Sequence, residues 1–269
     1  MRTIKLILAY DGTDFAGWQT QQSGRTVQAT LEEAIEKITG VRSSTLASGR
    51  TDAGVHALGQ VVSFRTESRL SAEVLQRALN AELPHSMAVL DAAEVHESFH
   101  ATHDALRKRY RYVIHDGPIR DIFSRRYAWH FTYGRLDVDA MQRAAAALLG
   151  THDFSSFETT GAPRKTSIRT VHNLRIERGR GEREHFVTLE IEANGFLYNM
   201  VRTIVGTLVD VGRGARPETW PGEVLKAMDR RRAGRTAPPQ GLFLVNVEYP
   251  REIKSEIRNT KSETNSKYK

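Results

Sequence analysis

The sequence of 269 residues contains no cysteine. Disulfide bonds, thiol nucleophiles and cysteine-ligated zinc are therefore excluded. Long hydrophobic runs are missing as well. The apolar stretch in residues 1–10 is too short for a signal peptide, and no other stretch approaches the length of a membrane span. These absences predict a cytoplasmic protein.

Acidic residues are fewer than basic ones, 32 against 39, which leaves a formal net charge of +7. An excess of positive charge favours a polyanionic partner, because contacts to phosphates release counterions. The apolar share of 39% is slightly low, but the length suffices for one large domain or two ordinary ones.

The first hundred residues alternate between strand and helix patterns. Ser71 can cap a helix, and Gly40 can end one. The expected elements are strands at 3–9, 60–65 and 87–95 and helices at 27–38 and 74–79. We interpret this half as β-α-β-β-α-β, a ferredoxin-like order that includes a fourth strand without a clear pattern of its own.

The second half shows a similar alternation of strand and helix patterns, without a sequence repeat. Strands are expected at 106–115, 127–131, 168–177, 186–192 and 242–249, and helices at 137–149 and 198–211. The expected fold class is α+β, with two ferredoxin-like lobes whose mainly antiparallel sheets lie side by side around a basic active-site cleft. The lobes should span residues 1–100 and 101–250. The polar residues 251–269 should be disordered.

One turn combines features that suit chemistry. In residues 49–57, GRTDAGVHA, Asp52 is the only carboxylate, Arg50 stands two residues before it, and glycines at 49 and 54 permit a tight backbone. Such a turn can hold a carboxylate at the rim of a sheet. From composition alone, an Asx turn that only caps a strand is the commoner interpretation.

Aromatic side chains recur beside basic or polar ones. Phe15 and Trp18, in the polar loop 11–25, are either core anchors or stacking surfaces for bases. In the strand after residue 106, Tyr110, Tyr112 and Ile114 share one face, and Arg107, Arg109 and Arg111 share the other. This strand is either half-buried with a solvated basic face, or it places a tyrosine against a base and arginines near phosphates.

Further arginines and lysines are spread over several loops and could form a basic surface that follows a folded RNA. They are Arg120, Arg125, Arg126, Arg164, Lys165, Arg169, Arg213, Arg216, Arg230, Arg231, Arg232 and Arg235.

Residues 96–100 spell H-E-x-x-H, the pattern of a zinc metalloprotease. That mechanism needs the pentad on a long helix together with a third ligand. Here His96 directly follows an expected strand, and no helical apolar stripe flanks the pentad. We therefore expect no metal site at His96 and His100.

The turn at 49–57 resembles the catalytic signature of the tRNA pseudouridine synthase A family. Three further stretches match the same family in order: YDGT at 10–13 continuing to GWQ at 17–19, FLYNMVR at 196–202, and APP at 237–239 continuing to GL at 241–242. The resemblance runs from about residue 3 to residue 249. It implies an isomerase that converts uridine to pseudouridine at positions 38, 39 and 40 of tRNA.

The resemblance also implies roles for five residues. Asp52 is the essential carboxylate, Arg50 helps to open and hold the flipped nucleotide, Tyr110 contacts the target base, Arg202 pairs with the aspartate, and Leu244 lines the uracil pocket. From the residues alone, Arg202 could instead reach solvent from the edge of its helix, and Leu244 is a core residue by default.

The family further implies a homodimer in which one tRNA contacts both subunits, and a reaction without cofactor or metal. The alternative is a non-catalytic RNA-binding protein on the same fold, which would keep the basic loops and aromatics but would not need Asp52.

Overall fold

The computed structural model describes residues 1–159 and 166–250. The expected disorder of 251–269 and the basic residues Arg164 and Lys165 lie outside the described residues. The chain forms two compact units. The described residues of the first are Met1–Leu106 and 246–250, and those of the second lie within Arg107–Val245.

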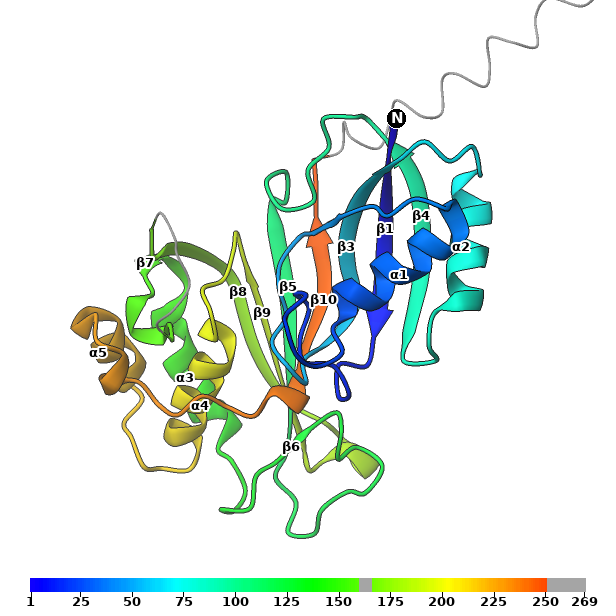
Figure 1. Cartoon of the computed structure of the whole chain (residues 1–269). Helices are drawn as coiled ribbons and strands as arrows, with labels where there is room; N and C mark the ends of the chain where they lie inside the picture. The colour runs from blue at the N-terminus through cyan, green and yellow to red at the C-terminus, as the bar shows by residue number, and fades with distance from the viewer. Residues whose placement is uncertain (160–165, 251–269) are drawn as a thin grey trace, which may run out of the picture. The chain divides into compact units, whose positions relative to one another are not determined.

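The first unit is built on antiparallel strand pairs. Its elements are β1 (Arg2–Tyr10), α1 (Val27–Thr39), β2 (Thr45–Ala47), β3 (His56–Thr66), α2 (Ala72–Glu82) and β4 (Met87–Val95). β1 pairs with β3 on one side and with β4 on the other, and β2 pairs with β3. The helices α1 and α2 lie beside these strands (Figure 1). The element order is thus β-α-β-β-α-β, with β2 as a strand for which the sequence showed no clear pattern.

Helix boundaries in this unit follow the capping residues. The Thr26 side chain accepts a hydrogen bond from the Ala29 backbone N–H, at 3.3 Å, and begins α1. Gly40 ends it at φ 75°, a left-handed conformation that glycine adopts without strain. Ser71 caps α2 in the same way through the Val74 N–H. These starts and the Gly40 stop confirm the sequence-based expectation.

The second unit contains six strands, counting β10 at its boundary, and three α-helices within its described residues. They are β5 (Arg107–His115), β6 (Trp129–His130), α3 (Val138–Ala145), β7 (Gly150–Asp153), β8 (Ile168–Arg178), β9 (Phe186–Ala193), α4 (Met200–Gly212), α5 (Trp220–Ala227) and β10 (Leu242–Glu248). Neighbouring strands run in the order β10-β5-β9-β8-β7, and β6 pairs with β5 in parallel. The pairs β5–β9, β9–β8 and β8–β7 are antiparallel.

Short 3-10 turns lie in the connections between these elements, and one of them directly follows α3. They are η1 (Ala146–Leu148), η2 (Ser155–Phe157), η3 (Gly181–Arg183), η4 (Arg230–Arg232) and η5 (Pro239–Gly241). The α+β class and the mainly antiparallel pairing are therefore confirmed.

Several expected boundaries were wrong. The strand expected at 127–131 shrinks to the two residues of β6, and the helix expected at 137–149 ends as α-helix at Ala145, continues as η1, and gives way to β7 at Gly150. The helix expected from residue 198 starts at Met200, because Asn199 adopts a left-handed φ of 60°. The sequence did not predict α5, because its eight residues include a proline and a glycine, which are poor helix formers.

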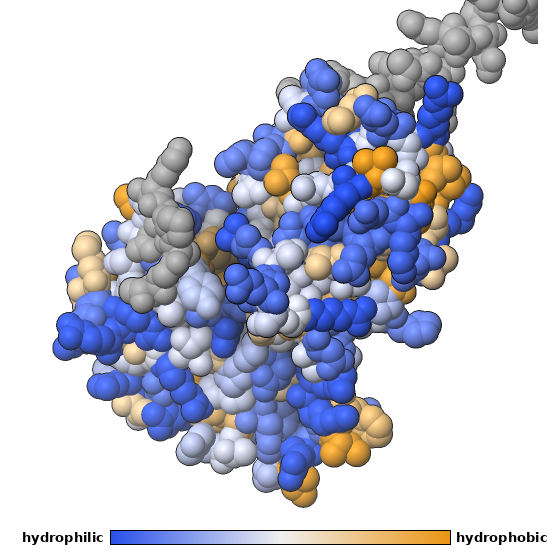
Figure 2. Space-filling view, in the orientation of Figure 1, coloured by the Kyte–Doolittle hydropathy of each residue, from blue (hydrophilic) through white to orange (hydrophobic). Residues whose placement is uncertain are grey.

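Hydrophilic residues cover most of the face drawn in Figure 2, and apolar residues appear there in small groups. Many of the larger apolar side chains are buried, among them Leu6, Phe64, Ile191 and Leu208. Within the described residues, no helix combines the length and the apolar character needed to cross a membrane.

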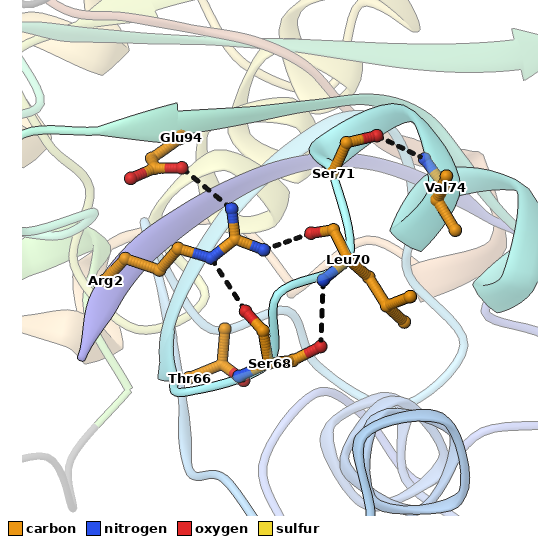
Figure 3. Close-up of polar contacts among 7 residues, drawn as sticks. All are labelled: Arg2, Thr66, Ser68, Leu70, Ser71, Val74 and Glu94. Carbon is orange, nitrogen blue, oxygen red and sulfur yellow. Dashed lines mark hydrogen bonds and ion pairs between the residues drawn. The ribbon is translucent and has the colours of Figure 1, made fainter.

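The Arg2 side chain links β1 to β4 and to the segment between β3 and α2 (Figure 3). From β1, its guanidinium donates to the Glu94 carboxylate of β4 at 2.8 Å and to the Ser68 carbonyl at 3.0 Å. It also donates to the carbonyl of Leu70, just before the cap of α2. The segment between β3 and α2 is thereby bound to the strands.

We expect Arg2→Met to lower the free energy of unfolding by about 1–3 kcal/mol, because it leaves backbone carbonyls without their charged donor. Equilibrium urea unfolding measures the change. Arg69→Met is the matched control, since Arg69 is exposed in the same segment. Equal stabilities of the two variants would contradict the role given to Arg2.

Candidate functional site

Asp52 lies in the loop between β2 and β3, and this loop folds back on itself. The Val55 N–H donates to the Asp52 carbonyl at 3.1 Å, and Gly54 takes a left-handed φ of 76°. Asp52 is partly exposed, whereas Thr51 and Val55 on either side are buried. The turn therefore presents the carboxylate-bearing residue between two anchored neighbours.

A second loop, residues 10–18, holds the Asp52 loop through its backbone. The Trp18 N–H donates to the Thr51 carbonyl at 2.9 Å, and the Gly54 N–H donates to the Phe15 carbonyl at 3.4 Å. The Tyr10 hydroxyl lies 2.8 Å from the Thr51 hydroxyl. Burial raises the pKa of Tyr10 to about 12, so this hydroxyl stays protonated at neutral pH. Two of the four sequence stretches singled out above are thus brought together.

Glycines make this approach possible. A side chain at Gly12 would place its Cβ 1.9 Å from the Val55 carbonyl oxygen, and one at Gly17 would lie 2.9 Å from the Thr51 carbonyl oxygen. Gly17 also has a φ of 97°, which L-residues rarely adopt. Each glycine is therefore required by the close contact between the two backbones.

Buried polar side chains secure the base of the loop. The Ser48 hydroxyl donates to the Gln60 side-chain oxygen at 2.6 Å, and the Gln60 amide donates to the Gly49 carbonyl at 2.7 Å. His56 places its Nδ1 atom 3.1 Å from the Gly12 nitrogen and 3.1 Å from an Asp11 carboxylate oxygen. The sequence analysis did not assign Gln60 or His56 a role, and the only available signal was their position within or just after the motif.

Phe15 and Trp18 are core anchors, because both are buried in the first unit, at 4% and 3% exposure. This result decides between the two alternatives left open by the sequence. Arg50, by contrast, is exposed at the surface of the same loop.

The second unit carries the other expected site residues. Tyr110 is buried in β5, and its ring meets Phe196 edge to face with centroids 5.0 Å apart. Tyr112 is fully buried and donates from its hydroxyl to the Pro238 carbonyl at 2.7 Å. Burial raises the pKa of Tyr112 far above its usual range, so the tyrosine remains a hydrogen-bond donor.

The arginine face of β5 is partly neutralised by β9. Arg111 forms a two-nitrogen contact with one Glu190 oxygen at 2.6 and 2.8 Å, and Arg107 binds Glu192 at 3.2 Å. Arg109 is exposed on the same face. For Arg107 and Arg111, a structural cross-strand role is therefore established, and their proximity to phosphate stays a prediction.

Arg202 joins the remaining two sequence stretches. From α4, its Nε donates to the Ala237 carbonyl at 2.7 Å, and its Nη1 donates to the Asn199 side-chain oxygen at 2.9 Å. The Ala237 N–H returns a hydrogen bond to the Arg202 carbonyl at 3.0 Å. Leu244, in β10, has no exposed surface. The structure thus places Arg202 and Leu244 in the second unit, with Tyr110.

The H-E-x-x-H pentad is not helical. Residues 96–100 form a turn after β4, in which His96 Nδ1 contacts the Ser98 hydroxyl at 2.8 Å. Among the residues that the structure describes, no group of three or more His, Asp or Glu side chains could hold a metal ion.

A family model and several curated relatives match this chain, and the residues that the family model matches include all four stretches. The family described as tRNA pseudouridine synthase matches residues 6–104 and 144–250. The chain is 47% identical over 249 residues to a tRNA pseudouridine synthase A of Thermoanaerobacter sp., covering 93% of this chain and 100% of that protein. It is 45% identical over 250 residues to one of Acetivibrio thermocellus, again covering 93% of this chain and 100% of that protein.

Among solved structures, an H/ACA RNP bound to a substrate RNA containing 2'-deoxyuridine is 11% identical, covering 77% of this chain and 53% of that chain. Its TM-score of 0.33 is too low to support an argument.

We expect Gly12→Ala to destabilise the protein by about 1–3 kcal/mol or more, because the added methyl group meets backbone rather than a movable side chain. Thermal unfolding monitored by circular dichroism measures the loss. Gly222→Ala is the control, because its new Cβ would lie 3.5 Å from the Ala147 Cβ, an ordinary contact. A Gly12→Ala protein as stable as this control would show that the two loops are not in tight contact.

Proposed function

Because the chain belongs to the tRNA pseudouridine synthase A family, we propose that it isomerises uridines 38, 39 and 40 of the tRNA anticodon stem-loop, with Asp52 as the essential carboxylate. Family membership makes the chain an isomerase that forms pseudouridine in tRNA. The target positions and the residue roles are our proposal.

The observation that carries this proposal is the support of the Asp52 loop. Backbone hydrogen bonds from Trp18 and Gly54, together with the Tyr10 hydroxyl, fix the residues around a partly exposed carboxylate. A turn that only capped a strand would not need a second loop to hold it at backbone distance. Catalysis benefits from such preorganisation, because a group fixed before the reaction loses no freedom during it.

The reaction breaks the N1–C1′ glycosidic bond, turns the uracil, and joins C5 to C1′. Asp52 either attacks C1′ or removes the 2′ proton to give a glycal. The detached base remains bound throughout, so the atoms balance without a cofactor. We therefore propose that no cofactor or metal takes part.

The remaining residues act on the nucleotide around Asp52. Arg50 is exposed, as a residue that opens and holds a flipped nucleotide must be, and base extrusion costs a few kcal/mol that such contacts offset. Tyr110 contacts the uracil, Arg202 pairs with Asp52, and Leu244 lines the uracil pocket. These roles require the two ferredoxin-like lobes to form a basic cleft around the base.

The proposal includes two features of the whole enzyme. It acts in the cytoplasm, and it acts as a homodimer in which one tRNA contacts both subunits. Tritium release from tRNA labelled at C5 of uridine tests the reaction, and tRNAs with a single uridine at 38, 39 or 40 test the positions. Binding without tritium release would instead support the non-catalytic RNA-binding alternative.

We expect Asp52→Asn to bind tRNA with nearly unchanged affinity and to release no tritium. The substitution is almost isosteric, so the loop should keep its fold, but an amide can neither attack C1′ nor accept the 2′ proton as a carboxylate does. Tritium release and filter binding are measured on the same preparation. Release at the wild-type rate would refute the assignment of Asp52.

We expect Tyr110→Phe to slow isomerisation of bound tRNA about a hundredfold or more, the typical effect of losing general acid–base help. A phenyl ring keeps the edge-to-face contact with Phe196 and still stacks, so binding should change little. Single-turnover isomerisation is the deciding measurement. A rate within about threefold of wild type would leave Tyr110 as a stacking platform without a role in proton transfer.

A further inference from the structure

Lys108 lies on the same face of β5 as Tyr110. Side chains alternate along a strand, so residues 108 and 110 point to one side and Arg107 and Arg109 to the other. Lys108 pairs with Ala193 of β9 in an uninterrupted register. Two steps along a strand span about 6.6 Å, which is within the reach of one nucleotide from its base to its own phosphates.

A second cation, Arg169, lies two residues from Val171 on the same face of β8, and Val171 and Lys108 both pair with Ala193 of β9. Burial, followed by the positive charge of Arg169, lowers the pKa of Lys108 to about 8. The Arg169 guanidinium is held in place by the carbonyls of Thr166 and Ile168, at 2.9 and 2.6 Å. Two positive side chains are thus kept near one another at the same end of β5 and β8.

Gly195 links this pair of cations to the Tyr110 ring. A Cβ at Gly195 would lie 3.5 Å from the Arg169 Nε and 3.7 Å from its Cδ, so the arginine side chain runs over the glycine. The next residue, Phe196, contacts the Tyr110 ring. Lys108, Arg169 and Tyr110 therefore surround one short turn after β9.

We propose that Lys108 and Arg169 bind one backbone phosphate of the tRNA, next to the uridine whose base contacts Tyr110. This inference rests on the proposed function, because it takes the base to be at Tyr110. A phosphate between two cations replaces their mutual repulsion with two attractions. Lysine and arginine are both common phosphate ligands, lysine as a point charge and arginine through its fork of N–H groups.

The site predicts a specific response to pH. In the free protein, Lys108 loses its proton as the pH rises through about 8. A bound phosphate raises the pKa of the same ammonium group, so the complex holds the proton more tightly and tRNA affinity falls between pH 7 and 9. Arg169 is the charged neighbour that lowers the pKa. On the opposite face, Glu192 and Glu190 bind Arg107 and Arg111.

The first experiment measures tRNA affinity by filter binding across salt concentration and pH for the wild type, Lys108→Met and Lys108→Arg. We expect Lys108→Met to weaken binding about tenfold or more and to reduce the slope of log affinity against log salt by about one phosphate contact. Lys108→Arg should retain binding and lose the fall between pH 7 and 9. The control Lys37→Met removes the same charge from an exposed ion pair with Glu82 and should change neither.

The second experiment compares altered substrates on the wild type and on Lys108→Met. An uncharged methylphosphonate is placed on the 5′ or the 3′ side of the target uridine in an anticodon stem-loop. One of the two should weaken wild-type binding about tenfold and should weaken Lys108→Met by a clearly smaller factor, since that variant has already lost the lysine contact and keeps only the one from Arg169. In the wild type alone, the same methylphosphonate should also remove the fall in affinity between pH 7 and 9, which keeps the inference testable even if a Lys108 variant folds poorly.

The outcomes distinguish failure of the phosphate site from failure of the proposed function. The phosphate site would be refuted by an unchanged salt slope in a folded Lys108→Met. It would also be refuted if the losses of affinity from Lys108→Met and from each methylphosphonate were additive. In both cases, tritium release by the wild type would still support the enzymatic function. A wild-type protein that releases no tritium from tRNA would overturn the proposed function itself.

Discussion

Direct contact between the backbones of residues 10–18 and 49–56 is the constraint on which the Asp52 loop depends. Hydrogen bonds between the two segments need N–H and carbonyl groups at about 3 Å, and any Cβ at Gly12 would occupy that space. Backbone bonds specify position more strictly than contacts between flexible side chains, because the backbone has few soft dihedrals. The Asp52 loop is therefore positioned by the segment that follows β1.

In the second unit, glycines likewise allow close backbone contact around α4. A Cβ at Gly206 would lie 1.8 Å from the Arg235 carbonyl oxygen, and one at Gly234 would lie 2.7 Å from the Thr207 backbone. The chain after η4 thus runs directly against the helix, and Arg202 binds it through Ala237. In each unit, two stretches that are far apart in sequence meet where glycine allows it. The roles proposed for Asp52 and Arg202 both draw on such supported backbone.

Positive charge is divided between structural and proposed binding roles. Arg107, Arg111 and Arg2 have carboxylate partners in the structure, which accounts for part of the basic composition. Lys108 and Arg169 lie close together, although like charges repel. Net charge therefore indicates that a polyanion is a suitable partner. Which cations bind it depends on the structure, because some of them are already paired with carboxylates on neighbouring strands.

Local sequence determined the elements whose signals are local: the caps and apolar period of α1, the alternation of β5, and the four stretches that identify the family. Tertiary structure decided the rest. The sequence could not show that Phe15 and Trp18 are buried, because a polar loop gives no period from which burial follows. It could not pair Arg111 with Glu190, which lies 79 residues away. It also could not distinguish Lys108 from the arginines beside it, because burial and the approach of Arg169 from β8 arise only when distant strands are hydrogen-bonded into one sheet.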